Sequence, residues 1–427
     1  MATLLIRNGH VIDPAQGIDQ EADVLIRDGK IERMEEHIQV AGDVSQVIEA
    51  RGLLVTPGLV DMHVHLRDPG FTEKEDIYTG CNAAATGGVT SLLCMPNTSP
   101  AIDNEETIRY IQTRARTARV RVYICAASTK GIAGKELGNY AMYRSMGVVA
   151  VSDDGRPIED EAMMEKAMCS AKKNGLAIVS HCEDLNIIDG GIIHKGSVSE
   201  ELGVKGMDRL SEDLVTAREI NIAERTGAPI HICHVSTRGS VEEIRKAKKK
   251  GIPVTAETCP HYFCFTHEKL RRRDADYRMN PPLREQDDVE AIVEGLFDGT
   301  IDCIVTDHAP HRKREKENFE AAPNGVVGLE TSLAAGIRYL VEERHFPLNR
   351  LIALMSTNPA RILKIPAGSI APGEAADLIL IDPNAEWTVL PERLQSKSKN
   401  TAFKFERLKG RVRYTLIDGK IVYVMRF

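Results

Sequence analysis

The sequence lacks paired cysteine motifs and long apolar runs, and these absences narrow the class of protein. Its nine cysteines are scattered, with no Cys-x-x-Cys pair, so they do not suggest the disulfide framework of a secreted domain. Several lie within apolar stretches (Cys94, Cys125, Cys233 and Cys303), where buried free thiols are expected. No apolar run approaches the ~20 residues of a membrane helix, and the N-terminal stretch turns polar too early for a signal peptide. We therefore expect a cytoplasmic protein with no membrane contact.

An excess of positive charge is also missing. The formal net charge is -7, which disfavours a nucleic-acid partner. No Gly-x-Gly-x-x-Gly fingerprint follows the first apolar run, which disfavours a dinucleotide-binding sheet. A small molecule is the expected ligand.

Most of the chain alternates between short apolar runs and helix-like segments. Eight runs occur, at 53–62, 89–95, 120–127, 147–152, 176–180, 229–235, 252–256 and 301–306. Helix-like segments fill most of the gaps; one ends at Gly175, and another, with a capping box at Ser240 and Glu243, ends at Gly251. Eight β–α repeats predict an α/β fold of the closed (β/α)8 TIM-barrel type, and an open doubly wound sheet is the alternative.

The two ends of the chain have a different pattern, with short strands joined by tight turns. Asn-Gly and Asp-Gly pairs separate strand-like runs in the first fifty residues, and Asp418-Gly419 does so near the C-terminus. Because chain termini often lie close together, we expect one small β-sandwich domain built from both ends. The predicted division is 1–53 with 367–427 for this β domain and 54–366 for the barrel.

Histidine and acidic residues gather where the predicted strands end, which is the catalytic face of such a barrel. They are His63 and His65 with Arg67, Asp153 and Asp154, His181, His231 and His234, and Asp307, His308 and His311, and Asn97 follows the second run. Neutral imidazoles and carboxylates are the ligands that zinc accepts. Because so many titratable groups at one barrel mouth would be unfavourable without a cation, the pattern predicts a metal site.

Spacing alone leaves two choices open. His231 and His234 differ by three positions, so a regular strand places them on opposite faces and only one can face the site. Asp153 and Asp154 present the same choice. Five further histidines lie in loops or outer segments and are expected to face solvent: His10, His37, His194, His267 and His345.

Several stretches resemble the longer, bacterial-type dihydroorotases of the amidohydrolase superfamily. The pattern His-x-His-x-Arg is followed by DPGFTEKEDIYTGCNAAATGGVTSLLCMPNTSP, and VSDDGRP, VSHCED, HICHVST, TAETCPHY, MNPPLR, TDHAPH and GSIAPGEAADLILID extend the match over nearly the whole chain. The resemblance implies a zinc enzyme that interconverts N-carbamoyl-L-aspartate and L-dihydroorotate in pyrimidine synthesis.

The resemblance also assigns the residues. His63, His65, Asp154, His181, His234 and Asp307 would bind one or two zinc ions, and the motif order selects His234 over His231 and Asp154 over Asp153. Zinc-activated water would attack the ring amide, with Asp307 as general acid and base. Arg67, Asn97 and His311 would hold the substrate carboxylate, Asn280 would contact the ring, and Asn324 and Gly325 would offer backbone contacts.

Two alternatives stay open beside this reading. Hydantoinases and allantoinases have a bridging carboxylated lysine after the fourth strand, where this chain has Asp154 and no lysine. Other dihydroorotase-like chains have lost their ligands and serve as scaffolds for aspartate transcarbamoylase, whereas every ligand position is filled here. An active enzyme that docks to that transcarbamoylase, or that forms a homodimer, is a further candidate state. The charged segment 311–330 is expected to be a loop that closes over substrate.

Overall fold

The computed structural model describes residues 3–40 and 44–425 and contains the expected barrel. Its eight strands pair in parallel in the order β15-β14-β13-β10-β9-β8-β7-β6. They are β6 (Leu59–Val64), β7 (Val89–Cys94), β8 (Arg121–Ala127), β9 (Ala150–Ser152), β10 (Ala177–Ser180), β13 (Ile230–Ile232), β14 (Val254–Thr258) and β15 (Cys303–Ile304). Each of the eight predicted runs contains one of these strands or overlaps it, so the sequence-based prediction of the barrel is confirmed.

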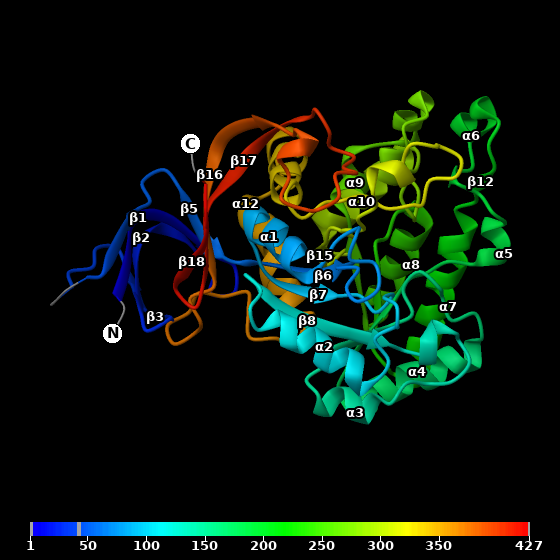
Figure 1. Cartoon of the computed structure of the whole chain (residues 1–427), viewed down its shortest axis with the longest axis horizontal. Helices are drawn as coiled ribbons and strands as arrows, with labels where there is room; N and C mark the ends of the chain where they lie inside the picture. Colours follow the sequence, from blue (N-terminus) through cyan, green and yellow to red (C-terminus); the bar gives the residue numbers. More distant parts are fainter. Residues whose placement is uncertain (1–2, 41–43, 426–427) are drawn as a thin grey trace.

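Helices surround the barrel strands, as Figure 1 shows. They are α1 (Ile77–Gly87), α2 (Glu105–Ala115), α3 (Tyr140–Ser145), α4 (Glu161–Asn174), α5 (Leu185–Ile188), α6 (Ser197–Leu202), α7 (Leu210–Thr226), α8 (Arg238–Lys249), α9 (Pro260–Cys264), α10 (Gln286–Asp298), α11 (Ser332–Ala335), α12 (Leu348–Ile352) and α13 (Asn358–Leu363). A short two-stranded sheet, β11 (Ile193–His194) with β12 (Gly206–Met207), lies between α5 and α7 along the chain.

The barrel closes where its first strand meets the segment after its last strand. Val64 and His308 form a parallel bridge there, and the His65 N–H donates to the His308 carbonyl at 2.9 Å. Below this bridge, the Thr306 hydroxyl donates to Asp61 Oδ2 at 2.6 Å. These closing contacts adjoin predicted site residues.

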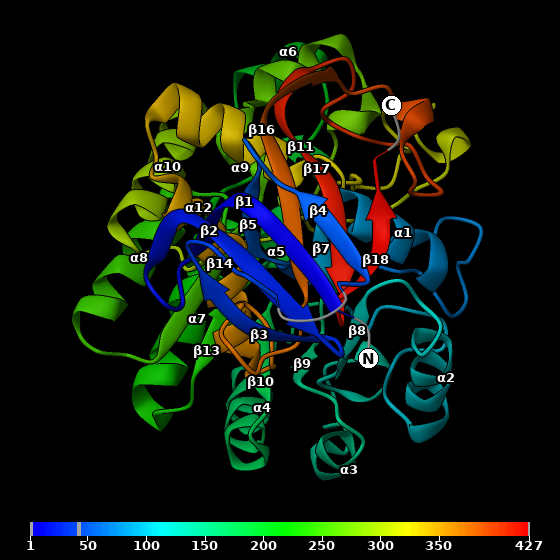
Figure 2. The same ribbon diagram turned by 90° about the vertical axis from the view of Figure 1, so that its left-hand side faces the viewer.

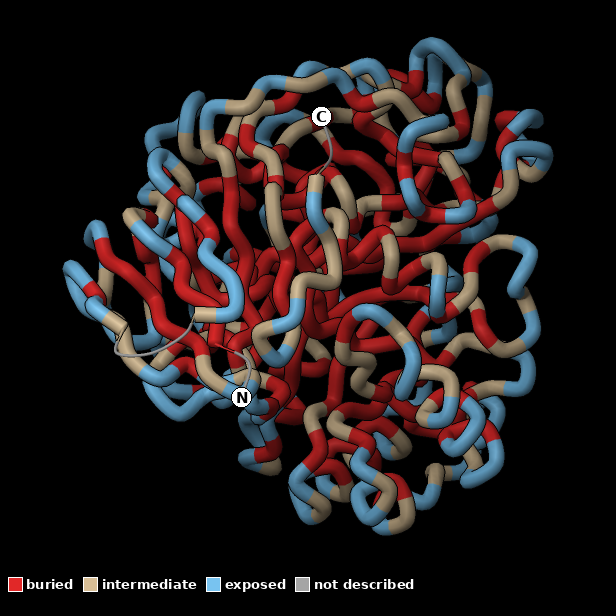
Figure 3. Tube along the Cα trace, turned by 60° about the vertical axis from the view of Figure 1, so that its left-hand side comes forward, coloured by how far each residue is buried: buried red, intermediate tan, exposed pale blue. Residues whose placement is uncertain are grey.

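The barrel has an inner and an outer apolar layer. Alternate side chains of a strand point to opposite faces, and in β6 the side chains of Val60 and Met62 join the inner cluster while Leu59 joins the outer one. In Figure 3 the buried residues form a continuous body through the strands. Cys94, Cys125, Cys233 and Cys303 are buried free thiols, as expected.

Strands from both ends of the chain form one further sheet, which faces the viewer in Figure 2. Its order is β18-β17-β16-β5-β1-β2-β3, and β4 also pairs with β1. The strands are β1 (Thr3–Asp13), β2 (Ile18–Arg27), β3 (Lys30–Glu35), β4 (Gln46–Glu49), β5 (Leu54–Pro57), β16 (Leu378–Thr388), β17 (Arg407–Ile417) and β18 (Lys420–Val424). The joint sheet confirms that the termini come together, and the division into two domains at residues 53 and 366 stays a prediction.

The boundary between sheet and barrel lies within the first predicted run. β5 pairs with β1 and β16 in the terminal sheet, and β6 begins the barrel only two residues after β5 ends. Gly58 separates them, and a Cβ there would lie 2.1 Å from the Thr90 hydroxyl oxygen. Only a glycine fits where the chain passes this closely from one sheet to the other.

In the described part of the chain, none of the helices combines the length and the apolar character needed to cross a membrane.

Candidate active site

The structure brings the six predicted metal ligands together at the carboxyl ends of five barrel strands. His63 and His65 come from the end of β6, Asp154 follows β9, and His181 follows β10. His234 follows β13 and Asp307 follows β15. All six side chains are buried. Residues far apart in the sequence therefore share one water-poor site.

An irregularity in β6 turns His63 toward the barrel interior. The pairing of β6 with β7 shifts register between Asp61 and Val64. Met62 joins the inner core, yet the next side chain, His63, also faces inner groups and lies 2.6 Å from Glu257. Because two consecutive side chains of a regular strand cannot face the same side, the shift is what admits His63 to the site.

Asp154 lies at the centre of the cluster. Its Oδ1 is 3.4 Å from His63 Nε2, 3.5 Å from His181 Nδ1 and 3.6 Å from His234 Nε2. Its Oδ2 is 3.4 Å from His65 Nε2. Ligands at 2.0–2.1 Å from a tetrahedral zinc ion are about 3.3 Å apart, so these spacings suit shared metal ions. The ligand atoms form two groups, His63 with His65 and His181 with His234, and both include Asp154.

The unpaired atoms of the cluster also fit a cation. His63 Nε2 and Asp154 Oδ1 are buried and have no hydrogen-bond partner among the described residues. His65 Nε2 faces Asp307 Oδ1 at 3.1 Å. Burial alone would raise the pKa of Asp154, but the surrounding imidazoles, His63 first, hold it well below its ordinary value. The carboxylate is therefore ionised and available as a ligand.

The two choices left open by spacing are resolved by the geometry. His231 turns away from the cluster, with Nδ1 2.8 Å from the Thr255 hydroxyl and Nε2 3.1 Å from Glu257. Asp153 also turns away and accepts the backbone N–H of Thr129 at 3.0 Å. His234 and Asp154 are the members of each pair that face the cluster.

The outer ring nitrogens of three histidines are held by side-chain oxygens. His63 Nδ1 donates to Glu257 Oε1 at 2.6 Å, and His65 Nδ1 donates to Asn97 Oδ1 at 2.8 Å. His181 Nε2 donates to Glu183 Oε2 at 3.2 Å. Each bond orients its ring and leaves the other nitrogen's lone pair facing the cluster. Sequence reasoning missed Glu183 and Glu257, although a carboxylate placed in or beside an apolar strand could have indicated them.

The predicted substrate contacts share a cavity with the metal ligands. The cavity has a volume of about 240 Å³, below the roughly 300–1,000 Å³ of sites for drug-sized ligands. Its lining includes His65, Arg67, Asn97, Asp154, Gly155, His181, His234, Asn280, Asp307, Ala309, His311, Asn324 and Gly325. All the predicted site residues line the cavity except His63. The space suits a small polar molecule.

Arg67 is the cation of this cavity. Its Nε donates to the Pro310 carbonyl at 3.3 Å, and no carboxylate pairs with its guanidinium within the described ranges. Arg67, His234 and Asp307 all have positive φ angles, of 61°, 32° and 46°. Such backbone conformations are uncommon outside glycine and cluster at functional sites.

His311 is neutral and engaged on both sides. Its Nε2–H donates to the Asn324 carbonyl at 2.9 Å, and its Nδ1 accepts from Lys74 Nζ at 3.3 Å. Burial, reinforced by Arg67 and Lys74, lowers the pKa of His311 to about 2. A contact between His311 and substrate stays a prediction, since the protein itself occupies both ring nitrogens.

The segment 311–330 is packed against the barrel mouth. Lys316 Nζ donates to the carbonyls of Arg278, Pro323 and Gly325 at 3.1, 2.9 and 3.0 Å. The Arg278 guanidinium donates to Asn324 Oδ1 at 3.1 Å. Closure of this loop over substrate stays a prediction.

Comparisons with known proteins identify the family of the chain. A family model described as dihydro-orotase-like matches residues 52–240, and an amidohydrolase family model matches residues 308–423. A curated protein named Dihydroorotase from Citrifermentans bemidjiense is 49% identical over 98% of this chain and 99% of its own length. Another from Acetivibrio thermocellus is 45% identical over 98% of both chains. The chain belongs to the dihydroorotase family.

Solved structures support the fold. The L-hydantoinase (dihydropyrimidinase) from Arthrobacter aurescens superposes with a TM-score of 0.90 at 23% identity, covering 100% of this chain and 98% of that one. The dihydropyrimidinase from Brevibacillus agri gives 0.86 at 25% identity, covering 98% and 94%. The curated relatives and the amidohydrolase family match together make this member of the dihydroorotase family a cyclic amide hydrolase of the amidohydrolase superfamily.

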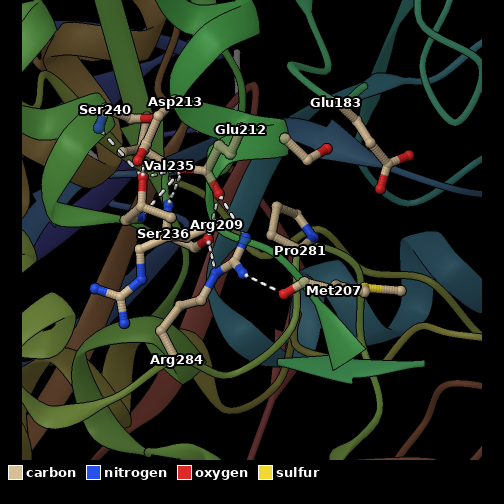
Figure 4. A network of polar contacts seen from close by, with 12 residues as sticks. Glu183, Met207, Arg209, Glu212, Asp213, Val235, Ser236, Ser240, Pro281 and Arg284 are labelled. Atoms are coloured by element: carbon tan, nitrogen blue, oxygen red, sulfur yellow. Dashed lines mark hydrogen bonds and ion pairs between the residues drawn. The ribbon is translucent and has the colours of Figure 1, made fainter. Parts of the chain in front are cut away.

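A buried polar network holds Ser236 and Thr237, which follow His234 in the chain of this dihydroorotase-family member (Figure 4 shows Glu212, Ser236 and Arg284). Glu212 Oε1 accepts the backbone N–H groups of Ser236 and Thr237 at 2.9 and 3.1 Å. The Arg284 guanidinium pairs with Glu212 Oε2 at 3.3 Å and donates to the Ser236 hydroxyl at 3.1 Å. The network ties the end of β13 to the loop that carries Asn280, and sequence reasoning did not identify Glu212 or Arg284.

Two histidines contradict the sequence-based prediction that they face solvent. His194 and His267 are buried, with only 1% and 4% of their surface exposed. Their rings contact each other, and Arg284 Nη1 lies 3.3 Å from His194 Nδ1. Burial and the nearby arginines lower the pKa of His194 to about 3. The prediction was wrong because the β11–β12 region folds against the loop of Arg284, a contact between segments 90 residues apart.

Proposed function

We propose that the protein catalyses the reversible cyclisation of N-carbamoyl-L-aspartate to L-dihydroorotate and water. The observation that carries the proposal is one small cavity in which Arg67, which pairs with no carboxylate among the described residues, lies beside two histidine pairs that share Asp154. Both the curated relatives and the missing bridging lysine favour this cyclic amide over a hydantoin or allantoin.

The two histidine pairs would hold one or two zinc ions, and Asp154, which belongs to both groups, and Asp307, beside His65, would complete the set of ligands. When bound, zinc lowers the pKa of bound water to about 7 and polarises a carbonyl oxygen. The remaining chemistry belongs to side chains of the protein.

Asp307 would move the proton. Burial opposes its ionisation, but the neighbouring imidazoles, led by His65, lower the pKa of Asp307 to about 2. An ionised carboxylate at this position can accept a proton from the attacking water. In ring opening it would then deliver that proton to the ring nitrogen that leaves the amide carbon, and the reverse order applies in cyclisation.

Arg67 and Asn280 would hold the substrate in register. A planar guanidinium binds a carboxylate through two parallel hydrogen bonds, which suits the carboxylate that substrate and product both carry. Asn280 Nδ2 donates to Glu183 at 2.9 Å, whereas its Oδ1 is buried and has no partner among the described residues. That oxygen is free to accept a ring N–H.

The test is turnover of L-dihydroorotate by the purified protein, with zinc measured on the same sample and with hydantoin and allantoin assayed beside it. Zinc-dependent opening of dihydroorotate alone is the expected result. Turnover of hydantoin or allantoin instead, or no turnover with zinc bound, would refute the proposal.

Cytoplasmic location, docking to aspartate transcarbamoylase and formation of a homodimer stay predictions. Size-exclusion chromatography with light scattering, with and without the transcarbamoylase, would test the two assemblies.

A further inference from the structure

A segment near the C-terminus reaches the active site although it lies in the part of the chain assigned to the β domain. It spans residues 394–406, between a short helical turn, η7 (Pro391–Arg393), and β17. In Figure 1 this orange-red segment leaves the terminal sheet and extends over the barrel. Asn400, near its middle, is 3% exposed.

The Asn400 side chain is fully hydrogen-bonded, and all its partners are main-chain groups at the cavity. Its Oδ1 accepts the His311 N–H at 3.0 Å. Its Nδ2 donates to the carbonyls of Ala309 and Gly325 at 3.3 and 3.0 Å. The reverse amide orientation would place oxygen against two carbonyls, so these partners fix how the side chain points.

Two of these bonds flank Pro310, whose carbonyl accepts from Arg67 Nε at 3.3 Å. The third holds Gly325, whose carbonyl also accepts from Lys316 Nζ. Gly325 has a φ of 139°, and a Cβ there would lie 2.7 Å from the Ala309 carbonyl oxygen. The two backbone segments are therefore packed closely. The Ala309 N–H donates directly to the Val326 carbonyl at 2.7 Å, and the Asn400 side chain adds hydrogen bonds to both segments.

The Asn400 backbone continues the same junction. Its carbonyl accepts the Val327 N–H at 2.9 Å. Asn400 thus contacts both segments of the cavity wall. Its side chain binds 309–311 and Gly325, and its backbone binds Val327. A role in filling space alone would not require a carboxamide that uses both amide hydrogens and its oxygen in hydrogen bonds.

We propose that Asn400 is a positioning residue that sets the carboxylate-binding side of the cavity. It holds the segment 309–311 against Gly325 and thereby fixes His311 and the Pro310 carbonyl that orients Arg67. This inference rests on the proposed function, because it assumes that Arg67 binds the carboxylate of the substrate.

The test compares Asn400→Ala and Asn400→Asp with the parent protein and with Asn384→Ala, a substitution at an exposed asparagine of β16. We expect KM for L-dihydroorotate to rise about tenfold or more in both Asn400 variants, with kcat within about threefold of the parent. The inhibition constant of orotate, a ring that carries the same carboxylate, should rise in parallel. The zinc content of both Asn400 variants should equal that of the parent. Asn384→Ala should leave KM and the inhibition constant of orotate unchanged.

Other outcomes are distinguishable. A parent that turns over dihydroorotate, beside Asn400 variants with unchanged KM, overturns the inference but leaves the proposed function standing. A parent that opens no dihydroorotate removes the proposed function instead. Asn400→Asp keeps the size of the side chain and the acceptor for the His311 N–H, so it provides the test if the alanine variant fails to fold. A fall in kcat that matches a loss of folded protein, with KM constant, would show a purely structural role.

Discussion

Glu257 offers the sharpest test of how the protein prepares its metal site. It is completely buried, accepts from His63 Nδ1 at 2.6 Å and contacts His231 Nε2 at 3.1 Å. Burial opposes its charge, but His63 and His231 outweigh that effect and lower the pKa of Glu257 to about 2. A carboxylate behind a ligand histidine fixes the ring and raises its basicity, and losing such a partner costs 10–100-fold in metal affinity, or about 1.4–2.7 kcal/mol.

We therefore expect Glu257→Gln to weaken zinc binding by about tenfold, because it keeps an acceptor for His63 and removes only the charge. Glu257→Ala removes both and should lie near the 100-fold end of that range. Competition with a chromophoric chelator measures the zinc dissociation constant without any assay of turnover. Asp288→Asn is a matched control, since Asp288 is a fully buried carboxylate that pairs with Arg209 at 3.2 Å, away from the cluster. Equal zinc affinity in both Glu257 variants and the parent would refute the reasoning.

Further predictions concern the substrate, the proton and the barrel closure. Arg67→Lys should raise KM at least about tenfold with zinc content unchanged, because a lysine cannot form two parallel hydrogen bonds to the substrate carboxylate. Steady-state kinetics measures this change. An unchanged KM would exclude Arg67 as the residue that binds the carboxylate. Asp307→Asn should lower kcat by about 10²–10⁴ with substrate still bound, and near-parental turnover in a zinc-loaded sample would remove Asp307 as the proton carrier. Burial raises the pKa of Asp61 to about 7, against the opposing hydrogen bonds from Thr306. The folded state then binds a proton that the unfolded state has lost, so native stability falls as pH rises through this window. Asp61→Asn cannot ionise, so it should not lose this stability. From about pH 5 to about pH 8, the free energy of unfolding of the parent should therefore fall by about 3 kcal/mol more than that of Asp61→Asn. Urea unfolding at both pH values measures the free energy of unfolding of the variant and the parent. A difference between the two proteins that is the same at both pH values would contradict the prediction.

The barrel was predictable because its signals are local and repeated. Each strand is a short apolar run, and each lies in the predicted order along the chain. The end of α4 at Gly175 was also local, since a left-handed glycine stops that helix. The start of α8 was not read correctly: Thr237 caps the helix and accepts from the Ser240 N–H at 3.2 Å, so Ser240 lies inside the helix and does not begin it. Thr237 and Ser240, three positions apart, are both residue types that cap helices, and only the fold selects between them.

The sequence predicted the metal ligands of the candidate site but not the residues that hold those ligands and the cavity wall in place. The ligands stand at strand ends, where barrel topology alone brings them together. The register shift that turns His63 inward depends on the neighbouring strand, so no count along β6 could reveal it. The supports of the site are single polar residues whose partners lie far away in sequence. Glu257 is 194 residues from His63, and Asn400 is 89 from His311. Without those contacts in view, such residues look like ordinary positions of a strand or loop.

The terminal sheet has a consequence for how the protein is made. β5 pairs with β16, and Pro57 lies opposite Leu378. At about 5–20 residues per second, a ribosome needs roughly 16–64 s to add the intervening ~320 residues. Throughout that interval, the edge of β5 that later binds β16 is without its partner, while the whole barrel is synthesised between them. The nascent chain thus carries an open strand edge until β16 (Leu378–Thr388) has been synthesised, and a chaperone could shield this edge during that time.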